Sequence, residues 1–169
     1  MILSDKEIRK YVKDRKLVIE PLSAKQLGPN GIDLRVGDQY VRLLAGSSYR
    51  SHTYTKVSKV SIRANDRVLL STLERVEMPN NLVGLVNLRS SYARLGLTIA
   101  PTVIDAGFKG KLTFIVVGSS FPVELSVGDR FWHIVFVKST PAERAYSGKY
   151  QGAKGIQEYV SDNGNLSNR

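Results

Sequence analysis

Short apolar runs separated by turn residues constrain the fold of this chain more than any other feature. The runs are Ile32–Val36, Gln39–Leu44, Val57–Ile62, Arg67–Leu73, Leu82–Leu88, Leu112–Val117, Val123–Leu125 and Phe131–Lys138. They are rich in Val, Ile, Leu, Phe and Tyr, and Gly, Pro, Asn, Asp or Ser lies between them, which is typical of β-strands. The pattern predicts a mainly β fold, either a sandwich, a jelly roll or a distorted barrel.

One helix is expected, and it lies at the N-terminus. The sequence Ser4-Asp5-Lys6-Glu7 matches a capping box, and Ile8, Tyr11 and Val12 follow at helical spacing. The 169 residues fit one domain that spans 1–169, without a repeat or a linker. Within it, residues from about 146 to 169 are expected to form a mobile C-terminal loop and a polar, frayed tail.

The net charge of +10 favours an anionic partner, either a nucleic acid or a phosphorylated small molecule. The lysines and arginines are scattered, so no run of like charges forms a nucleic-acid-binding arm. The cysteine count is zero, which excludes disulfides, thiolate metal sites and cysteine nucleophiles. No leader sequence opens the chain and no apolar run is long enough for a bilayer. We therefore expect a cytoplasmic protein without a membrane partner.

The segment Asn87–Gly96 carries the first candidate site. Arg89, Ser90, Ser91 and Arg94 follow an apolar strand, and a helix that begins at Ser90 or Ser91 would direct its first N–H groups toward an anion. Arginine forks and serine hydroxyls suit phosphate oxygens. The alternative is a capped surface helix whose arginines are solvated.

A carboxylate, Asp105, ends the apolar run before the turn Ala106–Lys111. Beside a cationic phosphate pocket it could hold a water and take its proton, but Asp before Gly is also ordinary turn chemistry. Asp33, in Gly28–Arg35, is read as a residue that begins a strand. The Gly-rich stretch Tyr146–Gly155 could close over a nucleotide or form a disordered tail.

The two histidines, His52 and His133, give no metal-site spacing. His133 lies in the apolar run Phe131–Phe136, where a core or half-buried histidine is the default. No P-loop, dinucleotide-binding fingerprint or Ser-His-Asp order is present.

Taken together, these segments resemble the dCTP deaminase and dUTPase superfamily over nearly the whole chain, and most closely the archaeal dUTPases of the dCTP deaminase family. The resemblance rests on five stretches in compatible order, which are Met1–Asp5, Gly31–Gly37, Arg89–Arg94, Ile104–Gly110 and Lys149–Gly152. It implies a distorted β-barrel or jelly roll of the trimeric dUTPase type, with a homotrimer whose active sites lie at subunit interfaces.

The resemblance also implies roles for individual residues. Arg89, Ser90, Ser91 and Arg94 would contact phosphates, and Asp105 would lie beside the deoxyribose and the attacking water. Tyr146, Lys149 and Gln151 would belong to a C-terminal loop that closes on the nucleotide. Mg²⁺ would be bound through the triphosphate, which agrees with a sequence that carries no dedicated metal cage.

Two positions depart from the family pattern. In the deaminase branch a glutamate stands ten residues after the motif aspartate, and this chain has Ile115 there. Deamination needs a proton shuttle that isoleucine cannot supply, and general acid–base catalysis contributes roughly 10²–10⁴-fold. Glu124 and Glu77 are conceivable substitutes that the spacing does not support. In the closing loop, Ala153 replaces a second glutamine, which weakens the expected phosphate contacts.

The resulting hypothesis is dUTP diphosphatase, which converts dUTP and water to dUMP and diphosphate, with Asp105 as general base. Uracil selection is expected from backbone groups near Leu97–Thr102. One alternative is dCTP deaminase, alone or combined with diphosphatase activity. A remote alternative is a non-catalytic basic β-domain that binds nucleic acid with a steep salt dependence; the main hypothesis expects no nucleic-acid partner.

Overall fold

The computed structural model describes residues 1–161, so residues 162–169 of the predicted C-terminal tail lie outside the described residues. Its elements are α1 (Asp5–Lys13), β1 (Val18–Glu20), the 3₁₀ turn η1 (Ala24–Gln26), β2 (Leu27–Gly28), β3 (Gly31–Leu43), β4 (Ser51–Tyr54), β5 (Lys59–Ile62), β6 (Arg67–Glu77), β7 (Leu82–Leu88), α2 (Ser90–Ala93), β8 (Thr98–Ile99), β9 (Thr102–Ile104), β10 (Lys109–Val117), β11 (Val123–Ser126) and β12 (Arg130–Lys138). No helix among residues 1–161 is long and apolar enough to cross a membrane.

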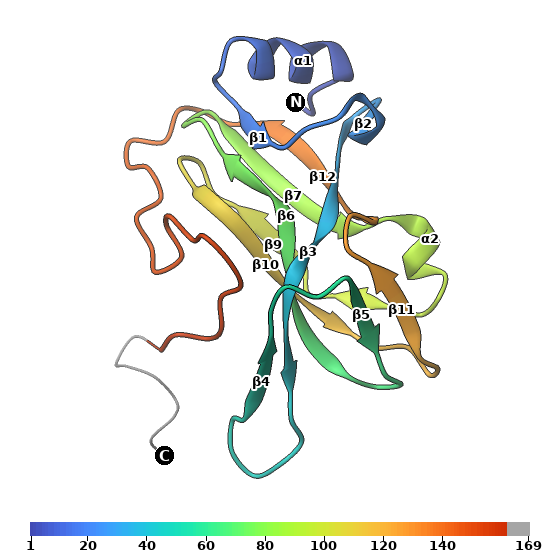
Figure 1. The fold of residues 1–169 in the computed structure, drawn as a ribbon. Helices are drawn as coiled ribbons and strands as arrows, with labels where there is room; N and C mark the ends of the chain where they lie inside the picture. Colours follow the sequence, from blue (N-terminus) through green and yellow to red (C-terminus); the bar gives the residue numbers. More distant parts are fainter. Residues whose placement is uncertain (162–169) are drawn as a thin grey trace.

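The strands form one curled antiparallel sheet with a small two-stranded sheet beside it (Figure 1). Along the large sheet the order is β8-β10-β6-β3-β12-β7-β9, with β1 on β6 and both β2 and β4 on β3. The second sheet pairs β11 with β5. The prediction of a mainly β, barrel-like or jelly-roll fold with a short N-terminal helix is confirmed.

Several strands differ from the predicted runs in extent. The runs Ile32–Val36 and Gln39–Leu44 form the single strand β3, whose pairing with β6 shifts register between Val36 and Tyr40. The Gly37-Asp38 signal therefore marks an irregularity within one strand rather than a turn. The strands that the sequence did not reveal, β1, β2, β4, β8 and β9, are only two to four residues long.

The predicted helix is present, but its predicted capping box forms only in part: the Glu7 carboxylate reaches back to the backbone of Ser4. Ser4 is the N-cap residue of α1, yet its side chain makes no capping hydrogen bond. The capping box that the structure contains joins Ser23 and Gln26 around η1. Ile8 is the buried residue of α1, so the helix is held by packing against the core more than by its first turn.

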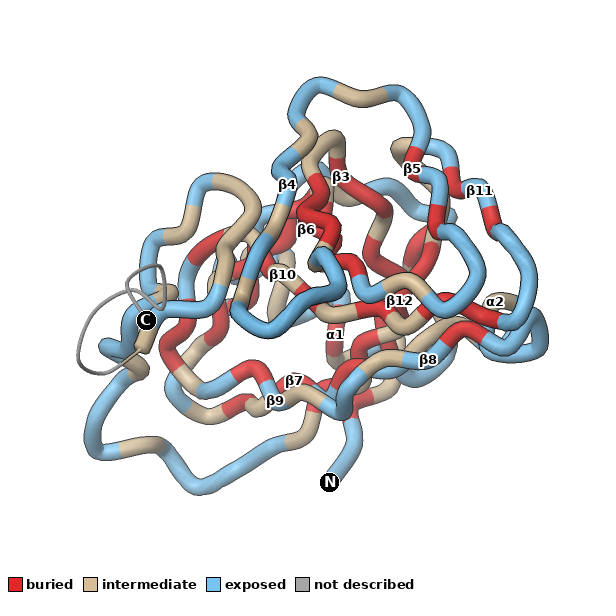
Figure 2. Tube along the Cα trace, turned by 90° about the horizontal axis from the view of Figure 1, so that it is seen from below, coloured by how far each residue is buried: buried red, intermediate tan, exposed pale blue. Residues whose placement is uncertain are grey.

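The core lies inside the curl of the sheet, where β-strand alternation directs every second side chain (Figure 2). Phe131, Trp132 and Phe136 of β12 are fully buried. The Trp132 ring packs against those of Phe114 and Phe131, with centroids 5.3 and 4.9 Å away. This central strand therefore supports both of its neighbours, β3 and β7, whose ends carry the candidate site residues.

Candidate active site

A polar cavity of about 440 Å³, here called the arginine pocket, opens where α2 follows β7. Its lining residues are Asp33, Asn87, Leu88, Arg89, Ser90, Ser91 and His133. Helix α2 begins at Ser90, one of the two starts considered for a helix here, and Arg89 is its N-cap residue. The structure thus brings three of the four predicted phosphate contacts together. The fourth, Arg94, ends α2 on the exposed surface and does not line this pocket.

A buried carboxylate, Asp33, holds the arginine pocket together. Its Oδ2 lies 2.9 Å from Nε of Arg89 and 3.5 Å from Nη1 of Arg130, and its Oδ1 lies 2.9 Å from Nδ1 of His133. Nη1 of Arg89 also donates to the backbone carbonyl of Arg130 at 3.1 Å. One ion pair and one hydrogen bond therefore hold the guanidinium in one orientation, with its other N–H groups left for a ligand.

Strand pairing explains why these groups meet. Asp33 on β3 pairs directly with His133 on β12, and His133 pairs with Asn87 on β7. The close approach of β3 to β12 depends on Gly31, because a Cβ there would lie 2.2 Å from the carbonyl oxygen of Ile134. From the sequence, Asp33 was interpreted as a residue that begins a strand and His133 as a core or half-buried histidine. The available signal was a carboxylate between the buried residues Ile32 and Leu34, which needs a partner.

This geometry predicts that Arg89→Lys weakens binding of inorganic triphosphate about tenfold, although the charge is kept. A lysine presents a single ammonium group and cannot hold Asp33, the Arg130 carbonyl and an anion in one plane. Isothermal titration calorimetry measures the effect, with Arg94→Lys as the matched control. Equal losses of triphosphate affinity in the two variants would show that the contact with Asp33 does not determine how much Arg89 adds to binding.

A second cavity of about 410 Å³, here called the aspartate pocket, contains Asp105 and shares no lining residue with the first. Its walls are mostly aromatic and aliphatic, with Tyr49, Phe108, Phe114, Tyr146, Tyr150 and Tyr159 among them. Lys111, Thr113, Gln157 and Glu158 supply polar groups. A flat ring with a few polar substituents fits this composition.

The carboxylate of Asp105 has no hydrogen-bond or ion-pair partner among residues 1–161. The turn is closed by backbone groups instead, since N–H of Phe108 donates to the carbonyl of Asp105 at 3.2 Å. Gly107 adopts a φ of +81°, and a Cβ there would lie 2.6 Å from that of Ala145. The turn-capping reading of the Asp105 side chain is therefore wrong, and its oxygens are available to a ligand or a water.

The second carboxylate of the aspartate pocket, Glu158, was missed in the sequence. It accepts hydrogen bonds from the hydroxyls of Tyr49, Ser51 and Thr53 at 2.8, 2.7 and 3.2 Å. The bond from Ser51, followed by those from Tyr49 and Thr53, lowers the pKa of Glu158 below its usual 4.5. The pKa of Tyr49 rises to about 12, through burial and then through Glu158.

At the position of the family glutamate, β10 carries the half-buried Ile115 opposite Leu69 of β6. Side chains two residues apart point to the same face of a strand, so Ile115 continues the face of Lys111 and Thr113. Neither of the two substitutes conceivable from the sequence takes its place: Glu124 lies on β11 and is paired with Lys59, and Glu77 is paired with Arg75 and Lys109.

The predicted closing-loop residues take different positions. Tyr146 lines the aspartate pocket and packs on Phe108, with ring centroids 5.6 Å apart. Gln151 binds the backbone around the Asp105 turn, accepting from N–H of Lys109 and donating to the carbonyls of Gly107 and Tyr146. Lys149 is exposed and donates to the carbonyl of Val160. Neither Lys149 nor Gln151 lines the pocket in this structure.

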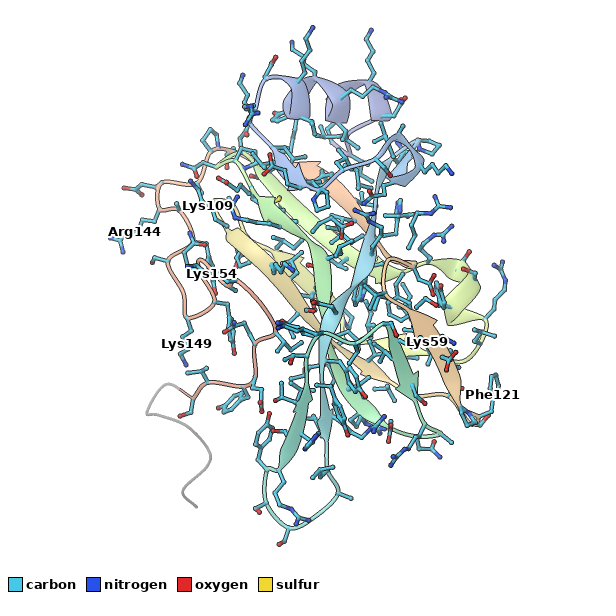
Figure 3. All side chains as sticks on the ribbon, in the orientation of Figure 1. Lys59, Lys109, Phe121, Arg144, Lys149 and Lys154 are labelled. Atoms are coloured by element: carbon cyan, nitrogen blue, oxygen red, sulfur yellow. The ribbon has the colours of Figure 1, made fainter. Side chains whose placement is uncertain are left out.

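Positive side chains gather on the side of the molecule that carries the C-terminal segment (Figure 3). Lys109, Arg144, Lys149 and Lys154 extend there, while Lys59 and Phe121 lie on the opposite side (Figure 3). No group of three or more His, Asp or Glu side chains within residues 1–161 is arranged to hold a metal ion.

Comparisons with known proteins agree with the sequence resemblance. A sequence model of the family described as dCTP deaminase-like matches residues 2–139. A protein of Sulfolobus islandicus rod-shaped virus 1, named probable deoxyuridine 5'-triphosphate nucleotidohydrolase, is 44% identical over 92% of this chain and 96% of its own. A dCTP deaminase of Desulfurococcus amylolyticus is 43% identical over 99% of both chains. Further relatives at 42–44% identity also carry the name dCTP deaminase.

Solved structures show the same fold. The crystal structure of 2'-deoxycytidine 5'-triphosphate deaminase from Agrobacterium tumefaciens superposes with a TM-score of 0.68 at 24% identity, over 80% of this chain and 47% of that one. The EIAV dUTPase superposes with a TM-score of 0.53 at 19% identity, over 80% of this chain and 98% of that one. The predicted dUTPase-type fold is confirmed by this likeness.

Proposed function

The chain belongs to the dCTP deaminase-like family of nucleotide-processing enzymes, and we propose that within it the protein is a dUTP diphosphatase. The observation that carries the proposal is the Asp105 carboxylate, which lies in an aromatic pocket without a partner among the described residues. The site has a free base, but no carboxylate at position 115 to move a proton to the leaving nitrogen of cytosine.

In the proposed reaction Asp105 accepts a proton from the water that attacks the α-phosphorus of dUTP. The bond from that phosphorus to the bridging oxygen breaks, so dUMP and diphosphate leave. Arg89, Ser90 and Ser91 hold the phosphate oxygens and stabilise the charge that develops on them, where most of the catalysis of phosphoryl transfer resides. We propose that the backbone near Leu97–Thr102 contacts the base.

The two pockets of one chain lie too far apart to form one site. Ile104, next to Asp105, pairs with Gly84 on β7. Arg89 lies five residues beyond Gly84. At about 3.3 Å per residue, about 17 Å of backbone therefore separates Arg89 from the position on β7 that pairs next to Asp105. A general base works only within about 3 Å of the proton it takes, or through one water. We propose that Asp105 of one copy therefore meets Arg89 of another.

An apolar sheet face between the pockets supports this assembly. Leu85 pairs with Val103 and with Val135, and the side chains of Leu85 and Val103 are 41% and 54% exposed. Val83 and Val137 extend the same face. Exposed apolar surface of this kind marks contact sites. A head-to-tail contact repeated around a threefold axis would join unlike pockets, so we propose a homotrimer.

We propose Mg²⁺ as the cofactor, held by the oxygens of the triphosphate because the described residues form no metal cage. When bound, the ion neutralises charge on the phosphates. Lys and Arg side chains on the C-terminal side of the molecule add positive potential that also favours the phosphates. We expect the protein to act in the cytoplasm, on free dUTP rather than on nucleic acid.

The names of several relatives favour dCTP deaminase as the second candidate. Parallel incubations with Mg²⁺ and either dUTP or dCTP separate the two, with diphosphate and ammonia both measured. We expect diphosphate from dUTP and no ammonia from dCTP. Ammonia from dCTP would establish deamination and show that Ile115 is bypassed. An intact oligomer that releases no diphosphate from dUTP would rule out the proposed function.

A further inference from the structure

The segment from Tyr146 to Val160, here called the C-terminal strap, crosses the aspartate pocket of its own chain. Its first half follows the Asp105 turn. There the N–H of Gly152 donates to the carbonyl of Lys109 at 2.7 Å, and the N–H of Lys111 donates to the carbonyl of Ala153 at 2.8 Å. Figure 1 shows this segment running beside β10. The first half of the strap is thus bound along β10, and its Tyr146 and Tyr150 already line the pocket.

The second half of the strap is held by side chains from the sheet. Oε1 of Gln39 accepts from N–H of Ile156 at 2.8 Å, and Oγ1 of Thr113 accepts from N–H of Gln157 at 3.0 Å. A Cβ at Gly155 would lie 2.4 Å from Oε1 of Gln39, so this glycine permits the close approach. Gly155 is therefore explained by its close contact with the sheet and not by a need for backbone flexibility.

The strap ends on the hairpin formed by β3 and β4, whose hydroxyls converge on one carboxylate. Both oxygens of Glu158 are used: Oε2 accepts from Tyr49 and Ser51, and Oε1 accepts from Thr53. These residues are separated from Glu158 by more than a hundred positions in the sequence. Hydrogen bonds to an ionised acceptor are about twice as strong as bonds between neutral groups.

We propose that Glu158 is a latch, which fixes the C-terminal strap across the aspartate pocket by accepting hydrogen bonds from Tyr49, Ser51 and Thr53. The latch positions Gln157, Glu158 and Tyr159 as walls of the pocket before any ligand enters. The β3–β4 hairpin thereby sets ligand affinity without touching the reacting atoms. Its effect on nucleotide turnover rests on the proposed function, whereas the closure of the strap does not.

The three hydroxyl donors also decide against a second role for Glu158. It is the other carboxylate of the pocket that holds Asp105, so it would be the nearest substitute for the missing family glutamate. A proton shuttle must take up and release a proton near the working pH. The hydroxyl bonds keep the pKa of Glu158 below 4.5, and a protonated Glu158 would lose part of the latch. Glu158 therefore positions the strap.

Limited proteolysis of the full-length protein tests the latch directly. Lys154 is an exposed trypsin site within the strap, and cleavage there reports how often the strap opens. We expect Glu158→Gln to raise the rate of cleavage after Lys154 about tenfold, because the amide loses the charge and one acceptor oxygen. Glu143→Gln removes the same charge from an exposed residue before the strap and should cleave at the wild-type rate.

The hairpin side of the latch supplies an independent variant. Replacing Ser51 by Ala and Thr53 by Val together should raise cleavage as Glu158→Gln does, and combining all three changes should add little more, because the groups act as one network. Cleavage of Glu158→Gln at the rate of Glu143→Gln, or full additivity between the two sides, would overturn the latch.

Kinetics then test the effect on the pocket. If the protein turns over dUTP, Glu158→Gln should raise KM severalfold and leave kcat unchanged, because the strap contributes binding that is equal in the ground state and the transition state. A lowered kcat at unchanged KM would contradict the positioning role. Absence of turnover in the wild-type protein would count against the proposed function alone, since the proteolysis result stands without it.

Discussion

Asp105→Asn should lower kcat for dUTP hydrolysis by roughly 10²–10⁴-fold, the range that general acid–base catalysis contributes. The amide is nearly isosteric with the carboxylate but cannot accept the proton of the attacking water. Because the Asp105 side chain has no partner among residues 1–161, its replacement should leave the folded structure unchanged. Steady-state diphosphate release measures the loss, and circular dichroism and the melting temperature check the fold.

The same variant tests the assembly. Neither Asp105→Asn nor Arg89→Ala should be active alone, but a mixture unfolded and refolded together should regain activity. In random mixed rings, roughly a quarter of the interfaces join an intact Asp105 to an intact Arg89 from another copy. Each variant refolded by itself is the control. A mixture that stays inactive while forming mixed oligomers would place both groups in the same chain's site and refute the composite arrangement.

Arg35→Met should destabilise the protein by about 3–5 kcal/mol, the cost of leaving a buried charge without its partner. Glu74 is fully buried, and its Oε1 lies 2.6 Å from Nε of Arg35 and 2.8 Å from Nε2 of Gln26. The second oxygen accepts from the backbone N–H of Arg35 at 2.9 Å. Without the guanidinium, the remaining donors to this buried carboxylate are neutral.

Urea unfolding at a fixed protein concentration measures this change, since the stability of an oligomer depends on concentration. Lys59→Met is the matched control, because Lys59 pairs with Glu124 where both side chains are 59% exposed. Its midpoint should stay close to that of the wild type. Adding Glu74→Leu to Arg35→Met should recover part of the loss, as no charge then remains buried. An unchanged midpoint for Arg35→Met would show that the ion pair does not hold β3 to β6.

The strands were predictable where they are long and their side chains alternate. β7 occupies the predicted Leu82–Leu88, and β12 extends the predicted run by one residue at its start. β8 and β9 were not predictable, because two or three residues carry no measurable periodicity and depend on strands already in place. The capping box shows the same limit: Ser4 and Ser23 both match the pattern, and tertiary contacts decided which one formed it.

In the candidate site too, some features were set by local sequence and others only by the tertiary structure. Local sequence determined the β fold, the start of α2 at Ser90, and the apolar residue Ile115 at the position where deamination needs a carboxylate. These properties depend on a residue and its immediate neighbours. Only the tertiary structure joined Asp33 to Arg89, joined Glu158 to the β3–β4 hairpin and left Asp105 without a partner. The reason is physical: the partners of a buried or pocket-lining charge come from segments that lie 50 to more than 100 residues away in the sequence, and no local pattern encodes such contacts.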